Sequence, residues 1–172
     1  MGEMTMTTFN LTALRRPGGP PAWRRRRVLA IASAGGHWIQ LLRLMPAFAK
    51  HDVVFASTRE WCAADVGSAP FHLIPDASRW DKLRLAWSLA CVAWLLVRTR
   101  PDVVVTTGAA PGFFALRLGK LLGSRTVWVD SMANAEKLSL SGQSVGGHAS
   151  LWLTQWPHLA GAGGPSFHGR VL

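Results

Sequence analysis

Apolar runs alternate with helix-periodic stretches along the chain from Val28 onward. Six runs of four to six residues read VLAIAS (28–33), DVVFAS (52–57), FHLI (71–74), DVVVTT (102–107), RTVWVD (125–130) and LWLT (151–154). Such runs are typical of β-strands. Several are apolar on both faces, which indicates a sheet covered on both sides, and the helical stretches between them imply parallel, right-handed crossovers. The pattern therefore predicts an open, doubly wound α/β sheet, mostly parallel.

The turn after the first predicted strand is a distinctive short motif. It contains Gly35, Gly36 and His37 and runs directly into amphipathic periodicity, so that strand, tight turn and helix follow one another. This arrangement points backbone N–H groups and the positive end of a helix at a ligand. No Lys-Ser or Lys-Thr follows the glycines, and the spacing G-x-G-x-x-G is absent, which excludes a phosphate loop and a dinucleotide-binding turn. The motif indicates a ligand site without identifying the ligand.

A second glycine-containing turn follows the strand predicted at 102–107. The loop TTGAAPGFF contains Thr107, Gly108, Pro111 and Gly112 and leads into another helix. Glycine permits positive φ and a close approach to a ligand, and proline suits the first helical turn because its missing N–H has no partner there. Either turn alone is consistent with a tight connection. Because ligands of doubly wound sheets bind beyond the carboxyl ends of the strands, two such turns at neighbouring ends favour a binding crevice.

The loop after the strand at 125–130 is long and polar, with the sequence VDSMANAEKLSLSGQ. It carries Asp130, Ser131, Asn134 and Glu136. Long polar loops are more often functional than simple spacers. We therefore expect this loop to line the same crevice.

The stretch at 81–100 raises the question of membrane contact. It has no charge between Leu85 and Val97, but it is shorter than the roughly 20 apolar residues that a membrane-crossing helix needs. One interpretation is a buried core helix. The other is a helix that partly faces lipid, with Trp87, Trp94 and Leu95 as its membrane residues and flanking cations that reach anionic head groups. Those cations are Lys82, Arg84, Arg98 and Arg100.

Composition and charge narrow the picture further. A chain of 172 residues with 49% hydrophobic content suffices for one domain with a substantial core. Residues 1–27 carry six arginines against Glu3, which is half of the net charge of +10. This stretch lacks the apolar run of a signal peptide, and its Pro, Gly and Arg content does not favour a packed core, so we predict a disordered basic leader (1–27) before a single domain (28–172). Cys62 and Cys91 form no metal-binding pattern, which fits a reducing compartment and no metal site.

Four stretches carry a family resemblance: SAGGHWIQLLRL, PDVVVTTGAAPGFFALRLGKLLGSRTVWVDSMANAEKLSLSGQ, QWPHL and FHGRVL. Together they resemble the ALG-fourteen-type family of oligosaccharide and exopolysaccharide biosynthesis proteins, over nearly all of residues 28–172. The resemblance implies the acceptor-side subunit of a split GT-B glycosyltransferase, with one Rossmann-like half in this chain and a separate, small donor-binding subunit as its partner. It also implies a UDP-sugar donor bound mainly by that partner with no further cofactor, a polyprenyl-pyrophosphate-linked glycan as acceptor, and a peripheral location at the cytoplasmic face of the inner membrane.

The resemblance also suggests roles for the residues of the crevice. Transfer to a sugar hydroxyl needs a group that accepts its proton, and His37 at a helix N-terminus would have its neutral form favoured, as a general base requires. Glu136 is the second candidate. The predicted substrate-binding residues are Gly35, Gly36, Thr107, Gly108, Pro111, Gly112, Asp130 and Ser131, with the glycine amides as donors to the acceptor pyrophosphate or to the nucleotide.

Three alternatives stay open. An oxidoreductase or hydrolase on the same fold would need a G-x-G-x-x-G or G-x-S-x-G turn, or a Tyr-x-x-x-Lys pair that a chain without tyrosine lacks. A nucleic-acid-binding module would need interleaved basic and aromatic residues on one face, which the pattern does not show, so we expect no nucleic acid partner. A non-catalytic membrane scaffold that recruits the donor subunit would leave His37 with a structural role only.

Overall fold

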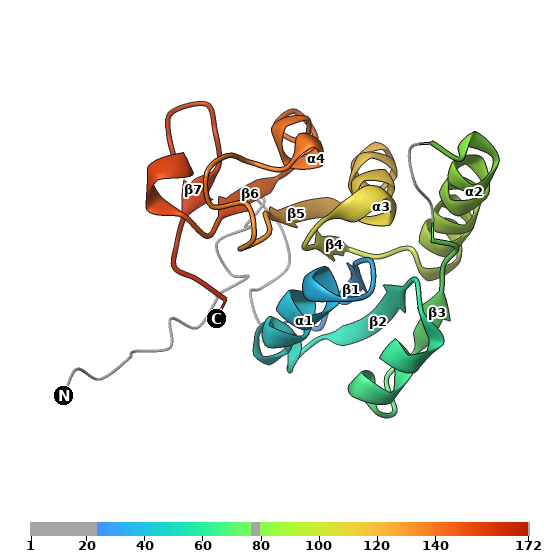
Figure 1. Cartoon of the computed structure of the whole chain (residues 1–172). Coiled ribbons are helices and arrows are strands. Elements are labelled where there is room, and N and C mark those ends of the chain that lie inside the picture. Colours follow the sequence, from blue (N-terminus) through green and yellow to red (C-terminus); the bar gives the residue numbers. More distant parts are fainter. Residues whose placement is uncertain (1–23, 77–79, 172) are drawn as a thin grey trace.

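One parallel sheet organises the part of the chain that the structure describes. The computed structural model describes residues 24–76 and 80–171, and its seven strands follow the order β3-β2-β1-β4-β5-β6-β7 (Figure 1). The strands are β1 (Arg27–Ile31), β2 (Asp52–Ser57), β3 (Phe71–Leu73), β4 (Val103–Thr106), β5 (Arg125–Val129), β6 (Leu151–Thr154) and β7 (Ser166–Phe167). The helices are α1 (Gly36–Arg43), α2 (Lys82–Thr99), α3 (Ala109–Leu121) and α4 (Leu140–Gln143), with 3₁₀ turns η2 (Met45–Phe48), η3 (Glu60–Val66) and η4 (Pro157–Leu159). Every neighbouring pair of strands is parallel.

All six predicted strands are present, with ends that differ by at most two residues. β1 begins at Arg27, one residue before the predicted domain boundary, and the Arg27 N–H donates to the carboxylate of Asp102 at 2.9 Å. β7 was not predicted, because a strand of two residues leaves no apolar run in the sequence. Residues 1–23 of the predicted basic leader lie outside the described residues, so the disorder of the leader stays a prediction.

Both faces of the sheet are covered, as the two-sided apolar strands predicted. On one face, Trp38 of α1 and Phe48 of η2 pack against the sheet in one hydrophobic cluster. On the other face, Val92 and Leu96 of α2 and Ala115 of α3 form a second cluster. Burial of one such aliphatic side chain contributes about 1.5–3 kcal/mol to folding. The helices on opposite faces confirm the doubly wound arrangement.

Helix α2 is neither purely a core helix nor purely a surface helix. The Asp81 carboxylate accepts the Arg84 N–H at 3.0 Å and caps its start, and Arg100 ends it with a left-handed φ of 44°. Its buried residues are Ser88, Val92, Leu95 and Leu96. Because these positions recur every three to four residues, they lie on one side of the helix. The prediction that Leu95 contacts the membrane is therefore wrong: its side chain is 2% exposed and belongs to the core.

Candidate functional site

The two glycine-containing turns lie next to each other at one edge of the sheet. β1 and β4 are neighbours in the sheet although β2 and β3 separate them in the sequence. Strand order therefore reverses between β1 and β4, and in doubly wound sheets this is the point where ligands bind beyond the carboxyl ends. The turn after β1 begins α1, and the turn after β4 begins α3. The sequence prediction placed both turns at this edge, and the structure confirms that placement.

The turn before α1 is open on its outer side. Gly35 has φ 85° and ψ −140°, a backbone conformation that glycine adopts and other residues rarely do. A Cβ added to Gly35 or Gly36 would meet nothing within 4 Å. The first N–H groups of a helix have no carbonyl partner within it, and α1 has no acidic residue in its first turn to offset their positive potential. The amides at the start of α1 are thus suited to an anionic ligand.

His37 joins the two turns through a pair of hydrogen bonds. Its ring Nδ1 lies 2.8 Å from the carbonyl oxygen of Thr107, and the Thr107 hydroxyl donates to the His37 carbonyl at 2.6 Å. A carbonyl oxygen only accepts, so Nδ1 carries the hydrogen. In the neutral ring, Nε2 then has a free lone pair. Among the described residues Nε2 has no hydrogen-bond partner, and the half-buried ring can therefore accept a proton at that atom.

Gly108 lies directly against the His37 ring. Its φ is 133°, and an added Cβ would lie 2.6 Å from the ring Cε1 and 2.8 Å from Nδ1. The next residue, Ala109, has φ 64°, a left-handed conformation that is strained for a residue with a Cβ. The Gly108 N–H donates to the Thr106 hydroxyl at 3.1 Å. The prediction that this amide donates to a ligand is therefore wrong, because the Gly108 N–H is already bonded within the chain.

Three further predicted substrate-binding residues of this turn are buried. Thr107 is buried with its hydroxyl bonded to His37, and Pro111 and Gly112 are buried in the first turn of α3. A Cβ on Gly112 would overlap the side-chain hydroxyl of Thr106. Gly112 thus permits α3 to pack closely on β4. The structure gives Thr107, Pro111 and Gly112 supporting positions and does not support direct substrate contact by their side chains.

Asp130 organises the long loop after β5 from within. It is buried, and its carboxylate accepts the Ser139 N–H at 3.0 Å, the Ser139 hydroxyl at 2.7 Å and the Asn134 amide at 3.3 Å. Both carboxylate oxygens are thus occupied by the loop itself. Ser131 is also buried, and its hydroxyl oxygen accepts the Gln40 side-chain amide at 3.1 Å. Asp130 and Ser131 therefore shape the loop at the carboxyl edge and connect it to α1.

Sequence reasoning missed Gln40 and Gln155, the two amides that complete this connection. Gln40 lies on α1 and Gln155 directly follows β6, and their side chains are 6% and 1% exposed. The Gln155 side-chain amide donates to the side-chain oxygen of Gln40 at 2.6 Å. The available signal was a polar residue at every third position of α1, in His37, Gln40 and Arg43, within an otherwise apolar helix.

Glu136 is exposed, and no hydrogen bond or ion pair joins it to His37 or to any other described residue. Its loop is held by the Trp156 indole, which donates to the Met132 carbonyl at 2.9 Å, and by His158, whose Nε2 lies 2.7 Å from the Ala135 carbonyl oxygen. No group of three or more His, Cys, Asp or Glu within residues 24–76 and 80–171 is placed to hold a metal ion. The structure therefore leaves Glu136 as a predicted catalytic residue without a contact to the rest of the site.

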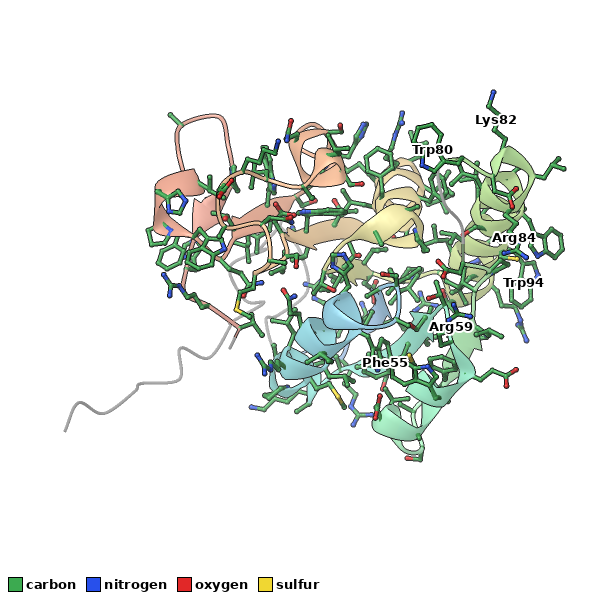
Figure 2. All side chains as sticks on the ribbon, viewed as in Figure 1. Phe55, Arg59, Trp80, Lys82, Arg84 and Trp94 are labelled. Atoms are coloured by element: carbon green, nitrogen blue, oxygen red, sulfur yellow. The ribbon has the colours of Figure 1, made fainter. Side chains whose placement is uncertain are left out.

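The outer side of α2 exposes several large apolar side chains. The exposed fractions are 86% for Leu83, 63% for Trp87, 59% for Trp94 and 58% for Val97. These positions follow helical spacing on the side opposite the core, and Trp80 before the helix is also exposed. Lys82 projects outward from the start of α2 (Figure 2), while the exposed Trp94 ring also lies edge-on to the ring of His72 in β3, with the ring centres 6.3 Å apart. No described helix is both long and apolar enough to cross a bilayer.

Two solved structures share the fold of this chain. The chain superimposes on the crystal structure of Acinetobacter baumannii MurG with a TM-score of 0.67 at 13% identity, over 83% of this chain and 45% of that one. It also superimposes on a UDP-N-acetylglucosamine 2-epimerase with a TM-score of 0.61 at 15% identity, over 77% of this chain and 42% of that one. The chain thus spans less than half the length of these structures. The predicted Rossmann-like half of a GT-B architecture is confirmed.

Proteins of similar sequence identify the family to which this chain belongs. The chain is 30% identical to the UDP-N-acetylglucosamine transferase subunit ALG14 of Eremothecium gossypii, over 83% of this chain and 76% of that protein. It is 25% identical to the subunit of the same name from Yarrowia lipolytica, over 81% and 78%, and 28% identical to that from Homo sapiens, over 77% and 76%. No family model matches the chain. The chain belongs to the ALG14 family of glycosyltransferase subunits, as its resemblance predicted.

Proposed function

We propose that this chain is the acceptor-binding, membrane-associating subunit of a two-subunit glycosyltransferase. The partner is a small donor-binding subunit, the donor is a UDP-sugar and the acceptor is a polyprenyl-pyrophosphate-linked glycan. The names of the relatives support a partner, because each is called a subunit of a UDP-N-acetylglucosamine transferase. The relatives' names make UDP-N-acetylglucosamine the first donor to test.

The observation that carries the catalytic part is the orientation of His37 at the reversal point of the sheet. Its Nδ1–H is held by the Thr107 carbonyl, which leaves Nε2 to accept a proton. In the transfer, the acceptor hydroxyl oxygen forms a bond to the anomeric carbon of the donor sugar. The bond from that carbon to the diphosphate breaks, UDP leaves with the electron pair, and the hydroxyl proton moves to His37 Nε2.

The open amides at Gly35 and Gly36 are assigned to an anionic group of the substrates, because they combine unpaired N–H groups with the positive end of α1. The acceptor pyrophosphate or the donor diphosphate fits this site. Glu136 is exposed to solvent. It remains the second candidate for the proton acceptor if His37 proves dispensable.

The apolar outer side of α2 is proposed as the membrane-contacting surface, at the cytoplasmic face of the inner membrane. Trp87 and Trp94 are amphipathic side chains of the kind that settle at the head-group boundary. Exposed cations at both ends of the helix match anionic lipids. These are Lys82, Arg84, Arg98 and Arg100.

A second candidate function is a non-catalytic scaffold that only recruits the donor subunit. The paired hydrogen bonds between His37 and Thr107 favour it, because they give His37 a structural role without any chemistry. His37→Asn distinguishes the two functions: asparagine retains a donor for the Thr107 carbonyl but has no Nε2. If His37 is the base, the assembled complex with His37→Asn loses turnover. If His37 is structural, it retains turnover.

Ligand binding by the chain without its partner tests the proposed division of labour. The expected result is that the chain in lipid nanodiscs binds a polyprenyl-pyrophosphate-linked sugar and does not measurably bind the UDP-sugar, while the two-subunit complex binds both. Gly35→Ala, which forces a Cβ into a positive-φ position, is expected to weaken acceptor binding. Binding of the UDP-sugar alone by the isolated chain, with no affinity for the lipid-linked sugar, would overturn the assignment.

A further inference from the structure

One side of α1 is tied to three separate parts of the chain. His37 bonds to Thr107 after β4. Gln40 accepts the Met132 N–H, in the loop after β5, at 3.0 Å. Arg43 donates to the carbonyl of Val171 at 3.2 Å. The three α1 residues are spaced by three positions, so they share one side of a helix of eight residues.

The central tie is a pair of buried amides whose hydrogen bonds are nearly complete. Gln155 donates to the Gln40 oxygen at 2.6 Å and to the Asp130 carbonyl at 3.0 Å, and its own oxygen accepts the Val171 N–H at 2.9 Å. The Gln40 oxygen thus accepts two donors, from Gln155 and from Met132, while the Gln40 amide donates to Ser131. Buried amides that leave groups unpaired are costly, so this pair has one low-energy arrangement.

Backbone groups fix which way each amide points. The Met132 N–H can only donate, so the oxygen of Gln40 must face it. The Val171 N–H can likewise only donate, and the Asp130 carbonyl can only accept, so the oxygen and nitrogen of Gln155 are both assigned. Turning either amide over would bring donors against donors. The hydrogen bonds therefore form one chain of fixed donor-to-acceptor direction, from the Val171 N–H to Gln155 and from Gln155 to Gln40 on α1.

We propose that Gln40 and Gln155 are positioning residues, which hold α1 against the loop after β5 so that the His37 ring keeps its contact with the Thr107 carbonyl. The kinetic consequence rests on the proposed function, since it requires His37 to act in transfer. The structural consequence does not: it concerns the His37 ring in the isolated chain. Neither glutamine touches a reacting group.

The first test is ¹⁵N NMR of the His37 ring in the isolated, folded chain with Gln40→Leu. The expected result is a shift of the Nδ1 and Nε2 signals away from the pattern of an Nδ1–H ring, together with faster hydrogen exchange of the Met132 amide. Gln40→Glu, which keeps an oxygen to accept from Met132 and Gln155, should restore the parent pattern. Ser124→Ala is the control, because it removes a buried bond to the Pro101 carbonyl at 2.6 Å without touching α1.

The second test is kinetic and uses the two-subunit complex. Gln40→Leu is expected to lower kcat by about tenfold to a hundredfold, the effect of a small misplacement of a reacting group, with the KM for the UDP-sugar within about twofold. In a His37→Ala background the same change should lower kcat no further, because Gln40 acts through His37. A purely structural role would lower kcat in both backgrounds.

Val171→Pro serves if Gln40→Leu does not fold. It removes the single N–H that Gln155 accepts, while Val171→Ala keeps that N–H. A change in the His37 signals with proline and none with alanine supports the proposal. Parent-like His37 signals in a folded Gln40→Leu or Val171→Pro chain overturn it, whether or not the complex transfers sugar. If the NMR changes occur as expected but the parent complex transfers no sugar, the proposed function fails and the structural proposal stands.

Discussion

Replacing Gly108 by alanine probes the contact on which the candidate site depends. Gly108 has a φ of 133°, and an alanine Cβ would lie 2.6 Å from His37 Cε1. An ordinary carbon–carbon contact is about 3.5 Å, so the ring must move by about 0.9 Å. Movement of this size disrupts the bond of 2.8 Å between Nδ1 and the Thr107 carbonyl oxygen.

Two effects of Gly108→Ala lower the free energy of unfolding, and they add. The unfavourable φ costs about 1–3 kcal/mol, and the weakened hydrogen bond costs about 0.5–1.5 kcal/mol. The expected destabilisation is therefore about 1.5–4.5 kcal/mol. Displacement of His37 is also expected to lower transferase turnover of the assembled complex about a hundredfold.

Urea unfolding of the parent, Gly108→Ala and Gly36→Ala chains measures the first effect. Gly36→Ala is a matched control in the facing turn, because its Cβ would meet nothing within 4 Å and its φ is not positive. We expect it to change stability by less than about 1 kcal/mol. If Gly108→Ala unfolds within about 0.5 kcal/mol of the parent and leaves the His37 ring signals unchanged, the proposed contact between Gly108 and His37 is refuted.

Three further predictions concern the other parts of the account. His37→Gln in the assembled complex should lower kcat by about 10² to 10⁴-fold with folding and partner binding unchanged; turnover within about threefold of the parent, with chemistry rate-limiting, would exclude His37 as the base. The double variant Trp87→Glu/Trp94→Glu should fold but no longer sediment with anionic vesicles, whereas Leu95→Glu should fail to fold because a buried, unpaired carboxylate costs several kcal/mol. If the double variant still binds vesicles, the outer side of α2 is not the membrane surface. Asp130→Ala should raise the protease sensitivity of the loop after β5, because the Ser139 N–H and the Asn134 amide lose their acceptor; unchanged cleavage would contradict its organising role.

The sheet could be predicted because its strands are short, continuous apolar runs. The rule that doubly wound sheets bind ligands at the carboxyl ends of neighbouring strands then predicted that the two glycine turns lie together. The face of α2 that packs on the sheet could not be predicted. The middle of α2 has apolar residues on all of its sides. The sequence pattern therefore does not show whether Leu95 or Trp94 faces the core. Tertiary packing alone decides that Leu95 is buried while Trp94 is exposed.

The proximity of the two glycine turns was predicted from the sequence, whereas the contacts within them were not. Glycines in a turn indicate backbone amides that are free to bind a ligand. The sequence does not show that the Gly108 N–H donates to the Thr106 hydroxyl, or that Gly112 packs against β4. The amide pair of Gln40 and Gln155 depends on partners 115 positions apart, a distance over which local patterns carry no information. Such long-range polar contacts follow from the fold and become visible only with it.

Reconstitution with the donor-binding subunit tests the central claim most directly. The chain, the partner and the complex of both are each supplied with UDP-N-acetylglucosamine and a polyprenyl-pyrophosphate-linked sugar in lipid nanodiscs, and transfer to the lipid-linked product is followed over time. The account predicts that only the complex transfers sugar and that the product remains lipid-linked. Transfer by this chain alone, or a stable complex that leaves the lipid-linked acceptor unmodified with every UDP-sugar supplied, would contradict it.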